Sequence, residues 1–264
     1  MLFESTVYLP VGLGMFQEIF HAPDAAALVR TLLRWSHFVA GIAWIGLLYF
    51  FNLVNVPLQK EIDADTKKKV NPGLLTRALW YFRWGAVVTV LVGLMYFAMY
   101  ILSPDAKNAR AFGGTTNTWL VLLVWLLFPL VIFFIEFFLI QRGLIKDGRV
   151  LAVIMAVLVI LMSVGIVYWL NGQLTTPSGE SYASNKTHSI GIGGAMGVIM
   201  MLNVWGIIWP SQKRIIAATT GKGPAAPPEL ARRAFLASRT NAWLSLPMLF
   251  FMATSHGDWI ILGK

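Results

Sequence analysis

Of the 264 residues in this chain, 57% are hydrophobic and only 12% are charged, and the mean hydropathy is +0.68. A soluble domain normally contains about a quarter charged residues, so these values exclude an ordinary soluble protein. The absence of cysteine from the sequence excludes disulfides, thiolate metal sites, iron–sulfur clusters and a covalent c-type haem. The formal net charge of +9 does not indicate nucleic-acid binding, because the basic residues gather in short segments between apolar runs.

Those apolar runs are about 20 residues or longer, which is enough to cross a hydrocarbon core of ~30 Å. We predict an all-α, polytopic transmembrane bundle that forms one integral-membrane domain over residues 1–264. Residues 1–27 are expected to form an interfacial segment without the features of a cleaved signal peptide. Six spans are expected: Leu28 to Leu58, Leu79 to Leu102, Trp119 to Ile140, Val150 to Leu170, Ser189 to Trp209 and Ala234 to Thr254.

Prolines and loop charges suggest where these spans end and how they are oriented. Pro104 and Pro210 are expected to close the second and fifth spans, and residues 215–230 to form a flexible cytoplasmic loop. The loops after the first, third and fifth spans are rich in Lys and Arg, whereas the opposite loops hold few. By the positive-inside rule, both termini are then expected to be non-cytoplasmic.

Three histidines are expected at a similar depth in the outer half of the membrane. His37 lies inside the first apolar helix, where an ionisable group usually faces a partner, a cavity or a cofactor. His188 opens the fifth span and His256 follows the sixth. Imidazole ligates haem iron and other transition metals and also transfers protons, so the three are candidate catalytic and cofactor-binding residues. The alternative is that His188 and His256 are interfacial residues and His37 bonds a neighbouring helix.

Two further patterns have a structural and a functional interpretation. Gly193 and Gly197 form a small-xxx-small pair, which favours close helix packing or, alternatively, admits the flat face of a macrocycle below His188. A polar layer is expected nearer the cytoplasmic side, with Glu136 paired to Arg83 or Arg239. This layer is either a structural ion-pair and amide network, or a proton path or substrate pocket. Its members are Arg83, Glu136, Asn203, Arg239 and Asn241.

Three blocks of this sequence resemble the urate oxidase N-terminal family, the membrane domain of bacterial cytochrome-c-coupled urate hydroxylases. The first runs from Trp35 to Gly46 and reads Trp-Ser-His-Phe-Val-Ala-Gly-Ile-Ala-Trp-Ile-Gly. The second runs from His188 to Arg214 and contains Asn203-Val204-Trp205. The third runs from Arg239 to His256. The chain is similar to a stand-alone variant of this domain without the family's cytochrome c domain.

This resemblance implies a multi-helix oxidoreductase of the bacterial inner membrane that converts urate to 5-hydroxyisourate, a step of purine catabolism. His37, His188, Asn203, Asn241 and His256 are the residues to which the resemblance draws attention. We expect haem b, with His37 and His188 as candidate iron ligands, and a separate cytochrome c or quinone as electron acceptor. A protoporphyrinogen-oxidase-like redox protein, a small-molecule transporter, and a non-catalytic haem-handling or assembly subunit are the alternatives.

Overall fold

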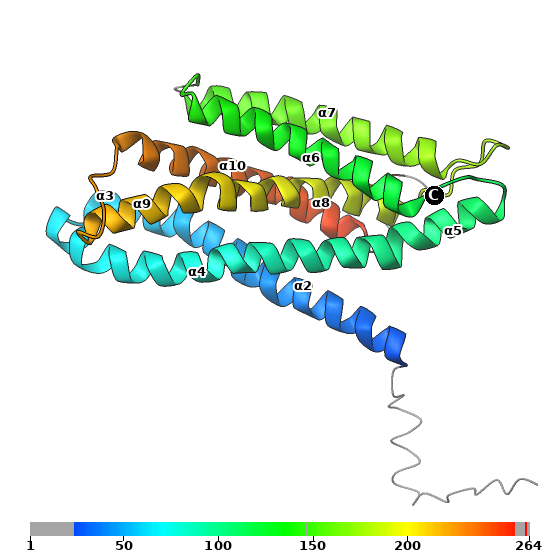
Figure 1. Ribbon diagram of the computed structural model, residues 1–264, viewed down its shortest axis with the longest axis horizontal. Helices are drawn as coiled ribbons and strands as arrows, with labels where there is room; N and C mark the ends of the chain where they lie inside the picture. Colours follow the sequence, from blue (N-terminus) through cyan, green and yellow to red (C-terminus); the bar gives the residue numbers. More distant parts are fainter. Residues whose placement is uncertain (1–23, 146, 257–261, 263–264) are drawn as a thin grey trace, which may run out of the picture.

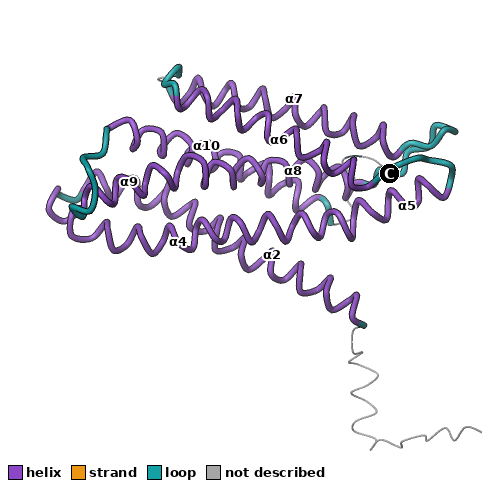
Figure 2. The backbone as a smooth tube through the Cα atoms, in the orientation of Figure 1, coloured by secondary structure: helices purple, strands orange, loops and turns teal. Residues whose placement is uncertain are grey.

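The computed structural model describes residues 24–145, 147–256 and 262, and their fold is a bundle of long helices without a β-strand in those ranges (Figures 1 and 2). The helices form six continuous rods. In chain order their elements are α2 (Ala25–Tyr49), a π segment (Phe50–Asn55) and α3 (Val56–Glu61); α4 (Ala64–Phe97), a π segment (Ala98–Leu102) and α5 (Ser103–Ala111); α6 (Thr118–Gln141); α7 (Gly148–Leu174); α8 (Asn185–Asn203), a π segment (Val204–Ile208) and α9 (Trp209–Thr219); and α10 (Pro228–Thr254).

Five of the six rods in the described chain are long and apolar enough to cross a membrane, which makes this a multi-pass membrane protein. They are Ala25–Glu61, Ala64–Ala111, Thr118–Gln141, Gly148–Leu174 and Asn185–Thr219. The sixth expected span, α10, is 27 residues long but begins with a polar half that contains Glu229, Arg232, Arg233 and Arg239. α8 lies at the centre of the bundle and packs against α4, α6, α7 and α10.

The second and fifth rods extend past Pro104 and Pro210, which were expected to end them. Pro57, Pro104 and Pro210 each stand two residues after a π segment, in the first turn of the helix that follows. A proline in a regular α-helix clashes with the carbonyl four residues earlier and lacks an N–H. The wider π turn relieves that conflict, so the second rod continues to Ala111 and the fifth to Thr219. The expected loop 215–230 is accordingly shorter, because α10 begins at Pro228.

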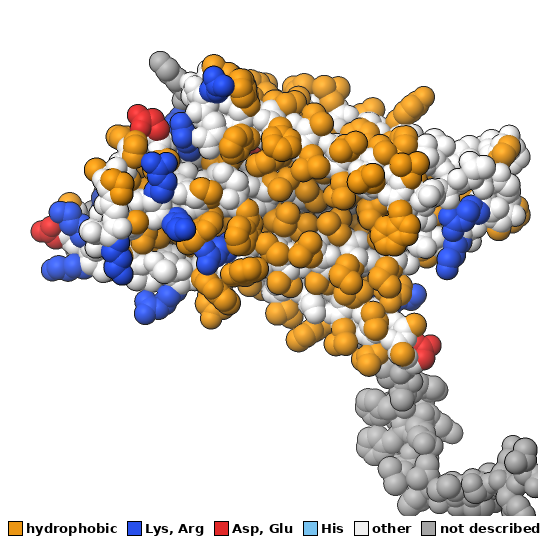
Figure 3. All heavy atoms as spheres, in the orientation of Figure 1, with side chains coloured by type: hydrophobic (Ala, Val, Ile, Leu, Met, Phe, Trp, Pro, Cys, Tyr) orange, Lys and Arg blue, Asp and Glu red, His pale blue; other side chains and the backbone are white. Residues whose placement is uncertain are grey.

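The charge distribution matches a bundle that stands across a bilayer. A broad band of apolar side chains covers the middle of the molecule, and Lys and Arg gather mainly at the end that holds α3 and α9 (Figure 3). The described start of α2 and the end of α10 lie toward the opposite end of the bundle (Figure 1). The non-cytoplasmic position of that end remains a prediction from the positive-inside rule. Most of the expected interfacial segment 1–27 lies outside the described residues.

Candidate functional site

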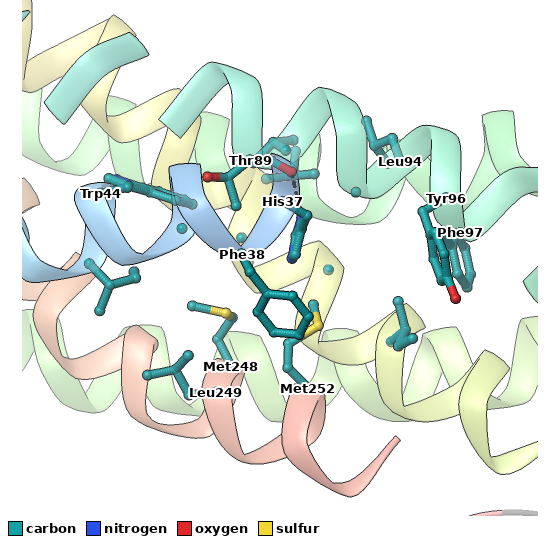
Figure 4. A pocket seen from close by; sticks show the side chains of 18 of the residues that line it. His37, Phe38, Trp44, Thr89, Leu94, Tyr96, Phe97, Met248, Leu249 and Met252 are labelled. Atoms are coloured by element: carbon teal, nitrogen blue, oxygen red, sulfur yellow. Dashed lines mark hydrogen bonds between the residues drawn. The ribbon is translucent and has the colours of Figure 1, made fainter. Parts of the chain in front are cut away.

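A cavity of about 690 Å³ lies between α2, α4, α8 and α10, with Trp125 of α6 in its wall. This volume falls within the ~300–1,000 Å³ usual for cofactor and ligand pockets. His37 enters from α2, and Met248 and Met252 come from the facing helix α10 (Figure 4). His256, just beyond the end of α10, also lines the cavity. The structure therefore brings together two of the three histidines singled out from the sequence.

The His37 ring is held in one orientation by the backbone of α4. Its Nδ1 lies 2.8 Å from the carbonyl oxygen of Thr89. A carbonyl oxygen only accepts, so Nδ1 carries the proton and donates. The neutral ring then has its lone pair on Nε2. A backbone-anchored Nδ1–H with a free Nε2 is the arrangement that fixes a metal-ligating histidine.

Small residues on α4 make room for this ring. Gly85, Thr89 and Gly93 recur every four residues, and they face Trp44, Gly41 and His37 of α2 respectively. A methyl group on Gly93 would lie 2.9 Å from the Cε1 and Nδ1 atoms of His37. Neither Gly93 nor the Thr89 carbonyl was identified from the sequence. The four-residue spacing of small residues on α4 is the signal that would have revealed this helix contact.

We expect Gly93→Ala to rotate the His37 ring and break its hydrogen bond to Thr89, because the added methyl occupies the position of the ring edge. Imidazole ¹⁵N chemical shifts, measured by solid-state NMR in lipid and assigned by difference with His37→Gln, report the tautomer directly. The wild type should show the Nδ1–H form, and Gly93→Ala a mixture of tautomers. Gly172→Ala is the matched control, because no atom lies within 4 Å of the added methyl there. An unaltered His37 signal in Gly93→Ala would contradict this packing.

A hydrogen bond with the Ser255 side chain favours the same tautomer at His256. The Ser255 hydroxyl donates its single hydrogen to the Met252 carbonyl at 2.7 Å. With that hydrogen on the Met252 carbonyl, the Ser255 oxygen accepts from Nδ1 of His256, which lies 2.6 Å away, and Nε2 then keeps the lone pair. Burial lowers the pKa of His256, and the positive charges of Arg34 and Lys186 lower it further. The ring thus stays neutral to a lower pH than a free histidine.

His188 does not line this cavity. Its side chain is 1% exposed in the first turn of α8, and neither ring nitrogen has a hydrogen-bond partner. The start of α8 is anchored through Asp105, whose Oδ2 accepts from the Ser184 amide at 2.9 Å and from the Thr187 hydroxyl at 2.6 Å. Ligation by His37 and His188 together remains a prediction, and the cavity geometry favours side chains of α10 as the residues opposite His37.

The two glycines of α8 have different environments. A methyl on Gly193 would lie 3.1 Å from the carbonyl oxygen of Met248, so this glycine permits the close approach of α8 and α10. Gly197 lines the cavity and has no atom within 4 Å of an added methyl. Gly194, which the sequence did not single out, also lines it. The helix-packing interpretation thus fits Gly193, and the smooth-surface interpretation fits Gly197.

The donors and the surface of the cavity suit an amphipathic planar group such as haem. Phe38, Ile42 and Leu249 line the cavity and are 60%, 73% and 41% exposed, so its rim opens onto the apolar band. The Phe38 ring lies between α2 and the methionines of α10 (Figure 4). Arg34 lines the same cavity. A haem placed here would find an imidazole Nε2, thioethers, a flat glycine surface and a cation for its propionates.

The expected polar layer forms as an amide network without the expected ion pair. The Glu136 side chain is fully buried, and its Oε2 accepts from Asn203 Nδ2 at 2.9 Å. The same Nδ2 donates to Asn241 Oδ1, and Asn241 donates to the Met200 carbonyl, each at 2.9 Å. No ion pair joins Glu136 to an arginine in the described chain. The guanidinium of Arg83 lies over the Trp209 ring at 3.8 Å, and that of Arg239 over Phe235 at 5.4 Å. Cation–π contacts have taken the place of the ion pair.

The sequence model of one protein family, urate oxidase N-terminal, matches residues 63–262 of the chain. The match begins at Asp63, the N-cap of α4, so it includes His188, Asn203, Asn241 and His256, and α2 with His37 precedes it. No curated protein and no solved structure matches the chain.

Proposed function

Because the chain belongs to the urate oxidase N-terminal family, we propose that it is a membrane-bound oxidoreductase of the urate hydroxylase type whose redox centre is a haem b held in the His37 cavity. The observation that carries the proposal is the pair of histidines with free Nε2 atoms on one apolar cavity. Electrons would leave to a separate cytochrome c or quinone. The protein would act in purine catabolism at the bacterial inner membrane.

The chain's own residues would perform the steps around that centre. His37 Nε2 would bind the iron, with Met248, Met252 or His256 on the facing wall as second ligand. When bound, haem supplies one-electron chemistry. If His256 is not a ligand, its Nε2 lone pair accepts a proton from a substrate at the cavity end near Arg34. Apolar side chains around the cavity exclude water from the reacting groups.

Urate turnover tests the reaction itself. Purified protein in lipid, given urate and ferricytochrome c, should consume urate while ferrocytochrome c accumulates at two equivalents per urate. The hydroxyl oxygen comes from water, and its addition releases two electrons and two protons. His37→Ala should abolish both signals. Failure of the wild type to oxidise urate with either ferricytochrome c or a quinone analogue as acceptor would reject urate as substrate.

Arg34 is expected to hold an anionic group of the bound cofactor. Arg34→Gln should weaken haemin binding by roughly tenfold, because a charge-assisted hydrogen bond contributes about 1.5 kcal/mol. The matched control is Arg30→Gln on the same helix, where the guanidinium lies over Tyr100 at 4.9 Å and does not line the cavity. Fluorescence of Trp44 and Trp125, which line the cavity, should be quenched on binding and so gives the affinity. Equal affinities for the two variants would show that Arg34 makes no such contact.

A further inference from the structure

The most unusual group outside the cavity is the buried carboxyl of Glu136. It lies where α6, α8 and α10 meet, is 0% exposed, and has no ion-pair partner among the described residues. An ionised carboxylate in such a place loses its hydration without gaining a cation, which is strongly unfavourable. The hydrogen bonds around it show how this cost is avoided.

Counting donors and acceptors leaves two oxygens without a partner. Both hydrogens of the Asn203 amide are used, one on Glu136 Oε2 and one on Asn241 Oδ1. Glu136 Oε1 and Asn203 Oδ1 are buried and receive no hydrogen bond. With an ionised carboxylate, both are acceptors, and nothing on the two side chains remains to donate to them. The hydroxyl of Thr240 also lies near Glu136, but it makes no hydrogen bond to Oε1.

One proton resolves both deficits. A hydrogen on Oε1 would donate to Asn203 Oδ1, while Asn203 Nδ2 already donates to Oε2, so the acid and the amide would form a reciprocal two-bond pair. We propose that Glu136 is a proton-binding site of the membrane domain, a neutral carboxylic acid that donates to Asn203. Uptake and release involve only the proton: the acid loses H⁺ to give the carboxylate, and no electron moves at Glu136.

The charged groups on the surrounding helices do not offset a carboxylate here. On α10, Arg233 donates to the Gln141 carbonyl at 2.9 Å and Arg239 lies over Phe235. Arg83 of α4 lies over Trp209. α7 carries Arg149 in its first turn. α8 carries Lys186 and His188 at its beginning, and both residues lie about 22 Å or more along the α8 axis from Asn203. None of the described hydrogen-bond partners of Glu136 is a cation that would stabilise its ionised form.

The site lies one helical turn beyond the inner end of the His37 cavity. Tyr49 lines that cavity and donates to Ser245 Oγ at 3.0 Å, because the Ser245 hydroxyl donates to the Ala242 carbonyl. Ser245 and Asn241 are four residues apart on α10, about 6 Å along the axis. Negative charge that appears in the cavity therefore favours the protonated form of Glu136, and positive charge favours the carboxylate. This coupling rests on the proposed redox function.

Infrared spectroscopy of the full chain in lipid tests the proton directly. Near neutral pH the wild type should show the C=O stretch of a protonated carboxyl that shifts in D₂O. Glu136→Gln should lose this band, and Glu229→Gln, at an exposed position in the first turn of α10, should keep it. In Asn203→Leu the band should persist at higher frequency, which keeps the test open if Glu136→Gln does not fold.

The outcomes separate this proposal from the redox function. No protonated-carboxyl band in the wild type, or a band that survives Glu136→Gln unchanged, would overturn the proton site. A band that behaves as expected in a protein that binds no haem would support the proton site while the redox function fails. With haem bound, the reduced-minus-oxidised infrared spectrum should contain the same Glu136 band, and its absence would overturn the coupling.

Discussion

Replacing His37 by Ala is expected to weaken haem binding at least a hundredfold, which corresponds to about 3 kcal/mol. His37 is the cavity residue whose free Nε2 is fixed by a backbone anchor, so its removal takes away an iron ligand and leaves apolar surface in its place. Titration of haemin into the purified variant, followed by the Soret band, measures the loss.

Two controls make this result specific. His188→Ala should keep the wild-type affinity if the second ligand comes from α10, because the His188 ring does not line the cavity. A loss as large as that of His37→Ala would instead favour the joint ligation by His37 and His188 that the sequence predicted. His37→Gly should recover the Soret band when free imidazole is added, since the vacated space lies on the cavity. Equal haemin affinity in His37→Ala and the wild type would show that the iron ligand is another residue.

The second large effect is expected at Asn203, where Asn203→Leu should destabilise the protein by about 3 kcal/mol. The change removes both hydrogen bonds donated by the amide and leaves Glu136 and Asn241 unsatisfied in the core. Thermal unfolding in detergent, monitored by circular dichroism, gives the difference. Adding Glu136→Leu to Asn203→Leu should recover part of the loss, because removal of both partners leaves fewer buried polar atoms without a bond. A double variant as unstable as the sum of the two single variants would mean that the two side chains act independently.

The sequence allowed the helices to be located but not their ends. Runs of apolar residues predicted all six rods, and five of these are apolar enough along a hydrocarbon length to cross a membrane. Pro104 and Pro210 predicted helix ends because proline disfavours the interior of an α-helix, although Pro72, Pro129 and Pro247 stand inside α4, α6 and α10. The chain instead widens into a π turn before each of them.

The candidate site could be predicted only in part, because the sequence gives the depth of a side chain in the membrane but not the direction in which it points. His37 and His256 could be matched by depth alone, and depth does not tell which side of a helix faces inward. His188, at a comparable expected depth, does not line the cavity, and Glu136 bonds an amide instead of an arginine. The hydrogen bond to the Thr89 carbonyl could not be predicted from residue types, because any residue at that position has a backbone carbonyl.

The reduced-minus-oxidised visible spectrum of the full chain, purified without added haem, tests most directly whether the His37 cavity holds a haem. A Soret band and the α band of a b-type haem are predicted, both missing in His37→Ala. A flat difference spectrum, in the wild type as purified and after haemin is added, would contradict it.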